Sequence, residues 1–224
     1  MKILELFCGT KSISKAFKER GHEVFTLDND DYHNPDLCKS ILDFDVKDLP
    51  KDWRNPDIIW ASPPCTTFSV MSFYNYWDFP YPKNSKASIN LGFVLKTLEI
   101  IKELKPKYWF IENPRGLLRK FKFMEKLHRK TVTYCQYGTD YMKPTDIWTN
   151  ATHWVPKPMC KPGADCHQEA RRGSKTGIQG FGGLRQSSGW RKEDRVARAI
   201  VPENLCLEIV DVCENKQKEE QKEL

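Results

Sequence analysis

Hydrophobic residues recur along this chain with two alternating periods, one typical of buried strands and the other of amphipathic helices. Short apolar runs predict strands at residues 3–7, 24–27, 58–61, 108–112 and 131–135. Apolar residues three and four positions apart predict helices at 12–20 and 90–104, and the second helix must end before Pro106. Strands that alternate with helices predict an α/β fold with a mostly parallel, Rossmann-like sheet and helices on both faces.

Two segments interrupt this alternation. Residues 70–90 are rich in aromatic and turn-forming residues and are expected to form a long loop or lid. Residues 151–192 contain proline, glycine and little periodicity, which is typical of an irregular insert. We therefore expect a main domain at 1–150, a small insert at 151–192, a C-terminal helix at 193–213 that returns to the domain, and a charged tail at 214–224.

Composition excludes several classes of protein. The chain has 224 residues, of which 39% are hydrophobic, and no apolar run approaches the roughly 20 residues that cross a bilayer. It begins without a signal peptide, and its eight cysteines are scattered. Reduced thiols in the cytoplasm, with no membrane partner, are therefore expected.

The net charge of +6 is concentrated in the second half of the chain. Residues 171–192 carry six basic residues, six glycines and no acid, and residues 115–130 carry seven Lys or Arg against one Glu. A polyanionic partner would explain both runs. A solvated basic surface is the alternative that charge alone leaves open.

The ends of the first two predicted strands suggest a cofactor site. Gly9 allows a close approach of the backbone, and Asp28 follows 19 residues later, where an acid typically binds ribose hydroxyls. The segment FCGTKS lacks the G-x-G-x-x-G pattern that holds a pyrophosphate. A nucleoside cofactor without a pyrophosphate, such as S-adenosylmethionine (SAM), fits this pattern best, although Asp28 alone could also be an ordinary surface acid.

The ends of the next two strands suggest covalent chemistry. Cys65 follows Pro63 and Pro64, which stop the strand and hold the following thiol in a stiff, extended segment. Glu112 ends an apolar strand, where burial would raise its pKa towards a value useful for proton transfer. Because parallel strands end at one edge of a sheet, these two groups are expected to meet the cofactor site. The alternatives are a structural cysteine and a glutamate that emerges into solvent.

Five segments, in this order, resemble the motifs of the cytosine-5 DNA methyltransferase family: LELFCGTKSISKAF, ASPPCTTFS, WFIENPRGL, YCQYGTDYMKPTDIWTN and RVARAIVPENL. The resemblance spans nearly the whole chain except 151–190, and the short chain is most similar to compact viral or phage members. It implies that SAM donates a methyl group to C5 of cytosine in DNA, through a covalent adduct at Cys65. It also implies that the base is flipped out of the duplex, and that residues 151–192 recognise the target.

The resemblance also implies roles for individual residues. The catalytic residues would be Cys65 and Glu112, with Lys143 the cation nearest to an expected arginine. Residues expected to hold the cofactor are Phe7, Cys8, Gly9, Asp28, Asn29, Asp43 and Pro63. Residues expected to contact DNA are Ser69, Arg115, Arg171, Arg172, Lys175 and Arg185. A monomer in the cytoplasm of a bacterium or a virus-infected host cell is expected.

Several positions depart from the family pattern and keep alternatives open. Asp146 stands where an arginine is expected, Arg198 replaces an asparagine, and Pro114 replaces a valine. A catalytically weakened DNA-binding relative is one alternative. A cytosine N4 amino-methyltransferase is another, since SPPC differs by one residue from that group's SPPY loop; RNA or a free nucleotide is a third possible substrate.

A metal site is a separate open question. Cys160, Cys166 and His167, with His153 upstream, could bind zinc, but their spacing is not that of a standard zinc finger. Coincidental thiols are the alternative interpretation. The other cysteines apart from Cys65, including Cys135, are interpreted as packing residues.

Overall fold

A mixed sheet forms the centre of the molecule. The computed structural model describes residues 1–70, 73–161, 163–167 and 199–215. Within these ranges, seven strands form a sheet in the order β3-β2-β1-β4-β7-β9-β8. The strands are β1 (Lys2–Leu6), β2 (Glu23–Asp28), β3 (Leu37–Cys38), β4 (Ile58–Ala61), β7 (Tyr108–Pro114), β8 (Arg129–Thr133) and β9 (Pro144–Thr149). β1, β2, β3, β4 and β7 run parallel to one another, and β9 runs antiparallel to both of its neighbours, β7 and β8. The expected mostly parallel sheet is confirmed.

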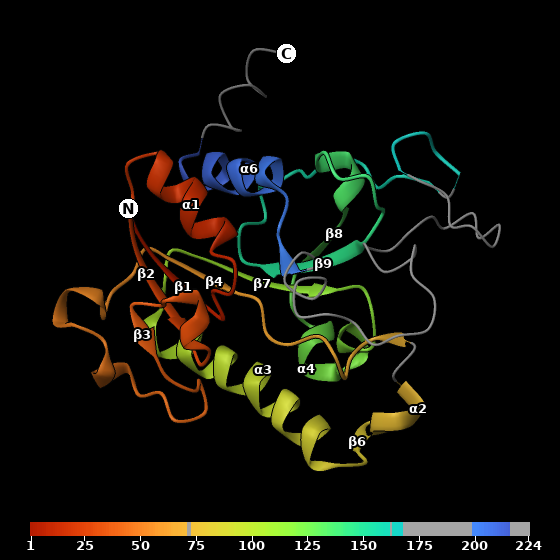
Figure 1. Ribbon diagram of the computed structural model, residues 1–224, viewed down its shortest axis with the longest axis horizontal. Coiled ribbons are helices and arrows are strands. Elements are labelled where there is room, and N and C mark those ends of the chain that lie inside the picture. Colours follow the sequence, from red (N-terminus) through yellow and green to blue (C-terminus); the bar gives the residue numbers. More distant parts are fainter. Residues whose placement is uncertain (71–72, 162, 168–198, 216–224) are drawn as a thin grey trace.

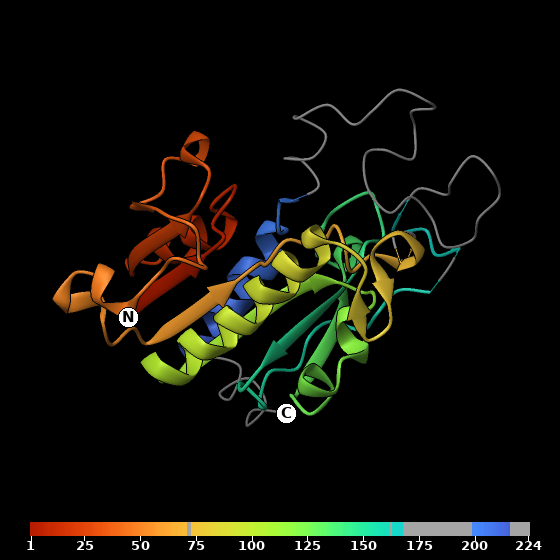
Figure 2. The same ribbon diagram turned by 90° about the horizontal axis from the view of Figure 1, so that it is seen from below.

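Helices cover both faces of the sheet, as predicted (Figures 1 and 2). On one face lie α1 (Ser12–Glu19) and α6 (Glu203–Cys213), and on the other lie α3 (Ser85–Leu104) and α4 (Lys122–Glu125). Shorter elements connect them: α2 (Phe73–Tyr76), β5 (Trp77–Asp78), β6 (Tyr81–Pro82) and the 3₁₀ turns η1 (Asp31–His33), η2 (Val46–Asp48), η3 (Lys51–Trp53), η5 (Leu118–Lys120) and η6 (Tyr134–Tyr137).

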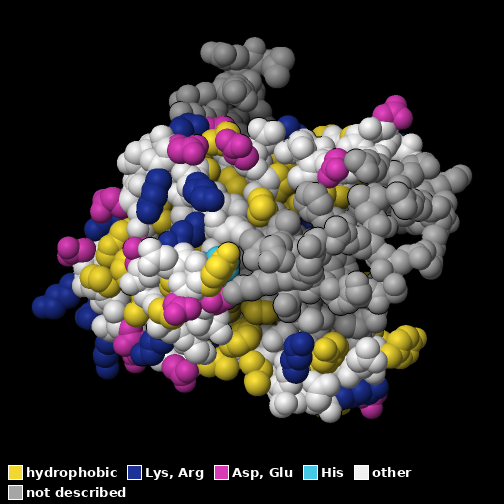
Figure 3. Space-filling model, in the orientation of Figure 1, with side chains coloured by type: hydrophobic (Ala, Val, Ile, Leu, Met, Phe, Trp, Pro, Cys, Tyr) yellow, Lys and Arg dark blue, Asp and Glu magenta, His cyan; other side chains and the backbone are white. Residues whose placement is uncertain are grey.

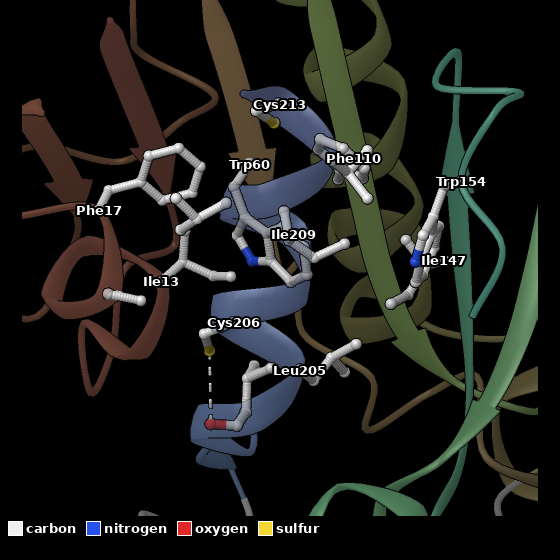
Figure 4. Packing of buried hydrophobic residues seen from close by; sticks show 14 of the residues in the cluster. Ile13, Phe17, Trp60, Phe110, Ile147, Trp154, Leu205, Cys206, Ile209 and Cys213 are labelled. Carbon is white, nitrogen blue, oxygen red and sulfur yellow. Dashed lines mark hydrogen bonds between the residues drawn. The ribbon is translucent and has the colours of Figure 1, made fainter. Parts of the chain in front are cut away.

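The core on the α1 and α6 face joins distant parts of the chain. Figure 4 shows Ile13 and Phe17 of α1, Trp60 of β4, and Leu205 and Ile209 of α6 around one apolar interior, and all five are fully buried. At the edge of this core, the Arg20 guanidinium lies 3.0 Å from the Asp211 carboxylate. The last described helix therefore completes the core that the first helix begins.

The elements depart from the predicted boundaries at three places. α3 begins five residues earlier than expected, because the Asn84 side chain accepts a hydrogen bond from the Ala87 N–H at 3.0 Å and caps the helix. The expected loop at 70–90 contains α2, the small β5–β6 hairpin and this first turn of α3. The strand expected at 131–135 is β8, which ends at Thr133 because the next residues form the 3₁₀ turn η6. This turn ends at Gly138, which has a left-handed backbone with φ +95°.

The C-terminal part of the chain is described in pieces. Of the helix expected at 193–213, residues 203–213 form α6 and the first six lie outside the described residues. Most of the expected insert also lies outside them, as does Arg198. No helix of the described segments has the length and apolar character to cross a membrane.

Candidate active site

Four neighbouring parallel strands carry the predicted site residues at their carboxyl ends. β2, β1, β4 and β7 are adjacent in that order, with Leu6 opposite both Leu27 and Ala61. The strand order reverses between β1 and β4, because the chain passes outwards to β2 before it crosses to β4. In open α/β sheets, ligands bind beyond the carboxyl ends of the strands at such a switch point.

The turn after β1 fits a nucleoside ligand. Phe7 and Gly9 both have left-handed backbones, with φ +56° and +42°, and a Cβ placed on Gly9 would meet only the Phe7 carbonyl, at 3.9 Å. The Gly9 N–H donates to Asp28 Oδ2 at 2.9 Å, so the expected glycine and acid are brought together. Asp28 Oδ1 accepts from the Asp30 N–H, and each carboxylate oxygen keeps a second lone pair for a hydroxyl.

The remaining predicted cofactor residues differ in exposure. The Phe7 ring packs edge-on against Phe93 of α3, at 5.8 Å between centroids. Cys8 is buried, and this burial raises its pKa to about 12, so its thiol stays protonated. Asn29 and Asp43 are exposed, whereas Pro63 is buried beneath the Cys65 loop.

The loop that carries the exposed Cys65 is anchored by the residues that follow it. The Phe68 N–H donates to the Cys65 carbonyl at 2.9 Å and closes a turn. The buried Thr67 holds this turn to the rest of the protein, because its hydroxyl accepts from Asn90 at 3.1 Å and its carbonyl accepts from the Trp77 indole at 2.7 Å. The thiol therefore stands on a turn whose base is fixed.

The segment after β7 packs directly against this loop. The Leu117 N–H donates to the Phe68 carbonyl at 2.7 Å. A Cβ on Gly116 would lie 2.3 Å from that same carbonyl oxygen, so only glycine allows the two backbones to approach. The Cys65 loop and the end of β7 are thus one packed unit.

Glu112 is a buried carboxyl at the end of β7. It accepts hydrogen bonds from the Tyr134 hydroxyl, at 3.1 Å, and from Ser62, which precedes the Pro63-Pro64-Cys65 segment. Burial raises the pKa of Glu112, while the Lys143 ammonium and these two hydrogen bonds oppose the rise. The carboxyl is therefore poised to hold or give up a proton near the Cys65 loop.

Asn113 ties the same two elements together. Its side-chain NH₂ donates to the Pro63 carbonyl at 2.9 Å, in a fully buried position. Its Oδ1 is buried without a hydrogen-bond partner among the described residues. Glu112 and Asn113, adjacent residues of β7, therefore contact Ser62 and Pro63, which precede Cys65. These contacts support the expectation that the thiol and the carboxyl serve one site.

Lys143 and Asp146, which lie where the family pattern changes, have distinct surroundings. The Lys143 ammonium lies 4.4 Å from the centroid of the Tyr134 ring. The hydroxyl of the same tyrosine donates a hydrogen bond to Glu112. Asp146 is fully buried and accepts from Arg119 Nε and the Thr131 hydroxyl, each at 2.8 Å. The aspartate in the arginine position is thus itself paired with an arginine, supplied by η5.

Two of the predicted DNA-contacting residues lie in the described segments. Ser69, on the Cys65 loop, and Arg115, after β7, are both exposed beside the site. Figure 3 shows hydrophobic side chains at the surface around α2, where Tyr74 is 81% exposed. The other four predicted residues, Arg171, Arg172, Lys175 and Arg185, lie outside the described residues.

Sequence reasoning missed several residues that position the predicted ones. Ser62, Tyr134 and Asn113 hold the carboxyl and the loop, and Thr67 anchors the turn. The position of Ser62 and Asn113 beside Pro63 and Glu112 was a usable signal. Nothing in the local sequence connects Tyr134 with a carboxyl 22 residues away.

Glu5 was also missed. It is an acid within the apolar β1, where it accepts from the Ser14 hydroxyl and from the Ser14 N–H at 3.1 Å, at the start of α1. Burial raises the pKa of Glu5 to about 7. An acid that interrupts a buried strand was the signal for this contact.

An open, mostly parallel sheet with helices on both faces, and with a glycine turn and an acid at neighbouring strand ends, defines the class of Rossmann-like methyltransferases. The solved structure of the Entamoeba histolytica methyltransferase EhMeth is similar to this fold, with a TM-score of 0.62 and 9% sequence identity. The match covers 96% of this chain and 98% of that one.

Sequence comparisons define the family. The family described as C-5 cytosine-specific DNA methylase matches residues 1–133. A probable DNA (cytosine-5)-methyltransferase of Frog virus 3 (isolate Goorha) is 32% identical over 224 residues, which covers 95% of this chain and all of that protein. The chain therefore belongs to the C-5 cytosine-specific DNA methylase family, a family of DNA (cytosine-5)-methyltransferases, as its motifs predicted.

Proposed function

We propose that this enzyme methylates C5 of cytosine in DNA with SAM, through a covalent adduct between Cys65 and the base. One observation carries the proposal: the buried Glu112 carboxyl stands on β7 beside Asn113, whose side chain donates to the Pro63 carbonyl at 2.9 Å, at the base of the exposed Cys65 loop. A proton-holding group and a thiol from adjacent strand ends are what addition to a pyrimidine ring requires.

The turn after β1 would hold the cofactor. Gly9 and Asp28 are joined by a hydrogen bond, and Phe7 supplies an aromatic ring at the same turn. In our proposal Asp28 binds the ribose, Gly9 lets the methionine part approach, and Asn29 and Asp43 line the adenosine side. SAM, when bound, supplies the methyl group that C5 receives.

Cys65 performs the first step. Its thiolate adds to C6 of the flipped cytosine, so that an S–C6 bond forms and the electrons of the C5=C6 double bond move into the ring towards N3. The anchored turn beneath Cys65 orients the sulfur for this attack. The result is a ring whose C5 is electron-rich enough to accept a methyl group.

Glu112 stabilises the charge that this addition creates. Because burial raises its pKa, the carboxyl can carry a proton and donate it to N3, while its other oxygen accepts from the exocyclic amine. Tyr134, Ser62 and Lys143 hold the carboxyl in place and limit the rise in its pKa. After methylation, a water molecule takes the C5 proton, the electrons of the C5–H bond re-form the C5=C6 double bond, and the S–C6 bond breaks to release the Cys65 thiolate. N3 then returns its proton to Glu112, which restores the aromatic ring and the starting state of the carboxyl.

DNA would approach over the surface that carries Ser69 and Arg115, with the aromatic segment around α2 closing over the extruded base. The basic residues 171–192 are proposed to neutralise phosphates and to recognise the target as part of the 151–192 insert. Tyr74 and Tyr81, which are 81% and 72% exposed, support a role for the α2–β6 segment in stacking on nucleic acid.

Trapping with 5-fluorocytosine DNA tests the covalent step. With SAM present, the fluorine at C5 blocks release of Cys65, so a protein–DNA adduct that survives denaturing electrophoresis is expected. Cys65→Ser should abolish the adduct and lower methyl transfer by at least about 10³-fold. Cys38→Ser, a change of another exposed cysteine, is the matched control and should retain both.

Nucleoside analysis of the methylated DNA separates the remaining alternatives. The proposal requires 5-methylcytosine, whereas N4-methylcytosine without an adduct would identify the amino-methylating alternative. DNA binding without any transfer of labelled methyl groups would identify a non-catalytic relative. Either result would overturn the proposed mechanism.

A further inference from the structure

Four metal-ligating side chains converge outside the proposed active site. Cys135 lies in η6, and Cys160, Cys166 and His167 lie in the segment that follows β9. One ligand atom from each of these four residues lies within 4.8 Å of each of the other three. From the sequence, Cys160, Cys166 and His167 are candidate zinc ligands, whereas Cys135 is interpreted as a packing residue.

The distances within the cluster are close to those between ligands around a single ion. Cys135 Sγ and Cys160 Sγ are 3.2 Å apart, and His167 Nδ1 lies 3.4 Å from Cys166 Sγ and 3.7 Å from Cys160 Sγ. Zn–S bonds of about 2.3 Å and Zn–N bonds of about 2.0 Å in a tetrahedron separate neighbouring ligand atoms by about 3.5–3.8 Å. A disulfide needs sulfurs about 2.05 Å apart, so the cysteines of this cluster are free thiols.

The surrounding backbone holds the ligand segment against η6. The Cys160 N–H donates to the Thr133 hydroxyl at 2.9 Å, and the Lys157 N–H donates to the Tyr137 hydroxyl at 3.0 Å. The Gln136 side chain also donates to Cys166 Sγ at 3.3 Å. The segment is therefore tied to the end of β8 and to η6 at several points, independently of any ion.

His167 is a second, independent sign of a ligand. The residue is only 7% exposed, its Nδ1 faces the sulfurs of Cys160 and Cys166, and its Nε2 has no hydrogen-bond partner among the described residues. An imidazole with so few polar contacts in a buried position is costly unless it binds something. Turning one ring nitrogen towards three thiols is the arrangement of a zinc ligand.

We infer that Cys135, Cys160, Cys166 and His167 bind one Zn²⁺ ion as a Cys₃His site. Three thiols release their protons and bind as thiolates, the neutral imidazole binds through Nδ1, and the bound site carries one net negative charge. Three sulfurs and one nitrogen in tetrahedral arrangement favour zinc over harder cations. Four protein ligands fill the coordination sphere, so the ion is structural and does not activate water.

The other candidates from the sequence have different contacts. His153 Nε2 lies 3.2 Å from the Val212 carbonyl of α6, and its ring packs against Tyr108. Cys206 and Cys213 are buried in the core beneath α6. The fourth ligand is therefore Cys135, and His153 is a packing residue.

The zinc site would connect the basic segment to the catalytic strand end. Cys135 directly follows Tyr134, whose hydroxyl bonds Glu112. His167 directly precedes residues 168–198, which contain the basic run. An ion at this point would fix His167, the last described residue before that segment, and Cys135, the residue next to Tyr134.

Metal content of the full-length protein tests the inference. Protein purified from zinc-supplemented cells without a metal-binding tag should contain about one zinc ion per chain by elemental mass spectrometry. Cys135→Ser and His167→Ala should each lower this content at least about tenfold. Cys38→Ser and Cys213→Ser are the controls and should keep the full content, and none of these measurements depends on methyltransferase activity.

Cobalt and a rescue variant keep the test decisive if these variants fold poorly. Co²⁺ in the wild-type protein should give the intense visible absorption of a tetrahedral thiolate site, and His167→Cys should retain zinc as a Cys₄ site. Wild-type protein without zinc, full zinc in Cys135→Ser, or a Cys135–Cys160 disulfide in non-reducing peptide mass spectra would each overturn the inference.

Discussion

Lys143 compensates, in part, for the burial of Glu112. The carboxyl lies in a desolvated position that raises its pKa, and the Lys143 ammonium is the strongest influence that lowers it. The ammonium is itself held over the Tyr134 ring, so one tyrosine contacts both charged groups. The lysine therefore supplies, from a different position, a positive charge near the buried carboxyl where the expected arginine is missing.

Replacing this lysine should move the pH dependence of the reaction. In Lys143→Met the pKa of Glu112 rises further, so the carboxyl keeps its proton to a higher pH. Since the protonated carboxyl is the active form in our mechanism, the alkaline limb of kcat/KM should shift to higher pH. Lys157→Met is the matched control, because Lys157 lies over the Tyr137 ring instead. An unchanged or downward-shifted limb in Lys143→Met would contradict this role.

At the residue scale, the reactive side chains could be predicted from the sequence, whereas most of the residues that hold them in place could not. Cys65 and Glu112 could be proposed from the sequence because each lies near the end of a predicted strand and close to a proline, where a stiff backbone fixes a reactive side chain. Tyr134 could not, because its contact to Glu112 depends on how β7 and η6 meet in space. Cys135 was missed for the same reason, since it lies 25 residues before Cys160.

At the element scale, the Cys65 loop and the turn after β7 approach each other so closely that only glycine fits at position 116. The Phe68 carbonyl accepts from the Leu117 N–H and occupies the space where a side chain on Gly116 would begin. Neither backbone can shift alone without losing this hydrogen bond.

Gly116→Ala should therefore damage both stability and catalysis. The new methyl group should cost about 1–3 kcal/mol in the free energy of unfolding and displace the loop, lowering kcat by about 10–100-fold. Gly92→Ala, in α3, is the control, because its Cβ meets only the Leu42 side chain at 3.4 Å and alanine favours the helix. Denaturant unfolding and kcat measure the two effects, and wild-type kcat in Gly116→Ala would refute the coupling.

Elements with strong patterns were predictable, and elements defined by distant partners were not. β1, β4 and α1 follow from apolar runs and helical spacing. β9 was missed because Pro144 and the buried Asp146 break its alternation, while its pairing with β7 and β8 makes it a strand. Asp146 is tolerated there because Arg119 and Thr131 satisfy its carboxylate.

At the scale of the whole molecule, Glu5 makes folding stability depend on pH. The carboxyl lies in β1, an interior strand of the sheet, and its pKa rises from 4.5 to about 7 on burial. Below the unfolded pKa it is protonated in both states. As the pH rises from about 4.5 to about 7, the unfolded chain loses this proton first, so the contribution of Glu5 to stability falls.

Glu5→Gln should remove this dependence while keeping the shape of the side chain. One pKa unit corresponds to about 1.4 kcal/mol, so the stability of the variant relative to wild type should increase by on the order of 3 kcal/mol between pH 4.5 and 7. Glu23→Gln, an exposed glutamate at the start of β2, is the control. Unfolding midpoints across this pH range measure the difference, and parallel curves for wild type and Glu5→Gln would exclude the effect.

The packing of α6 against α1 has a consequence during synthesis. Phe17 and Ile13 emerge from the ribosome early, yet their partners Leu205 and Ile209 come nearly 190 residues later. Until those partners arrive, the apolar underside of the first helix faces water or a chaperone. A nascent chain that stalls before residue 213 therefore presents an open hydrophobic surface, which marks it for quality control before it can reach DNA.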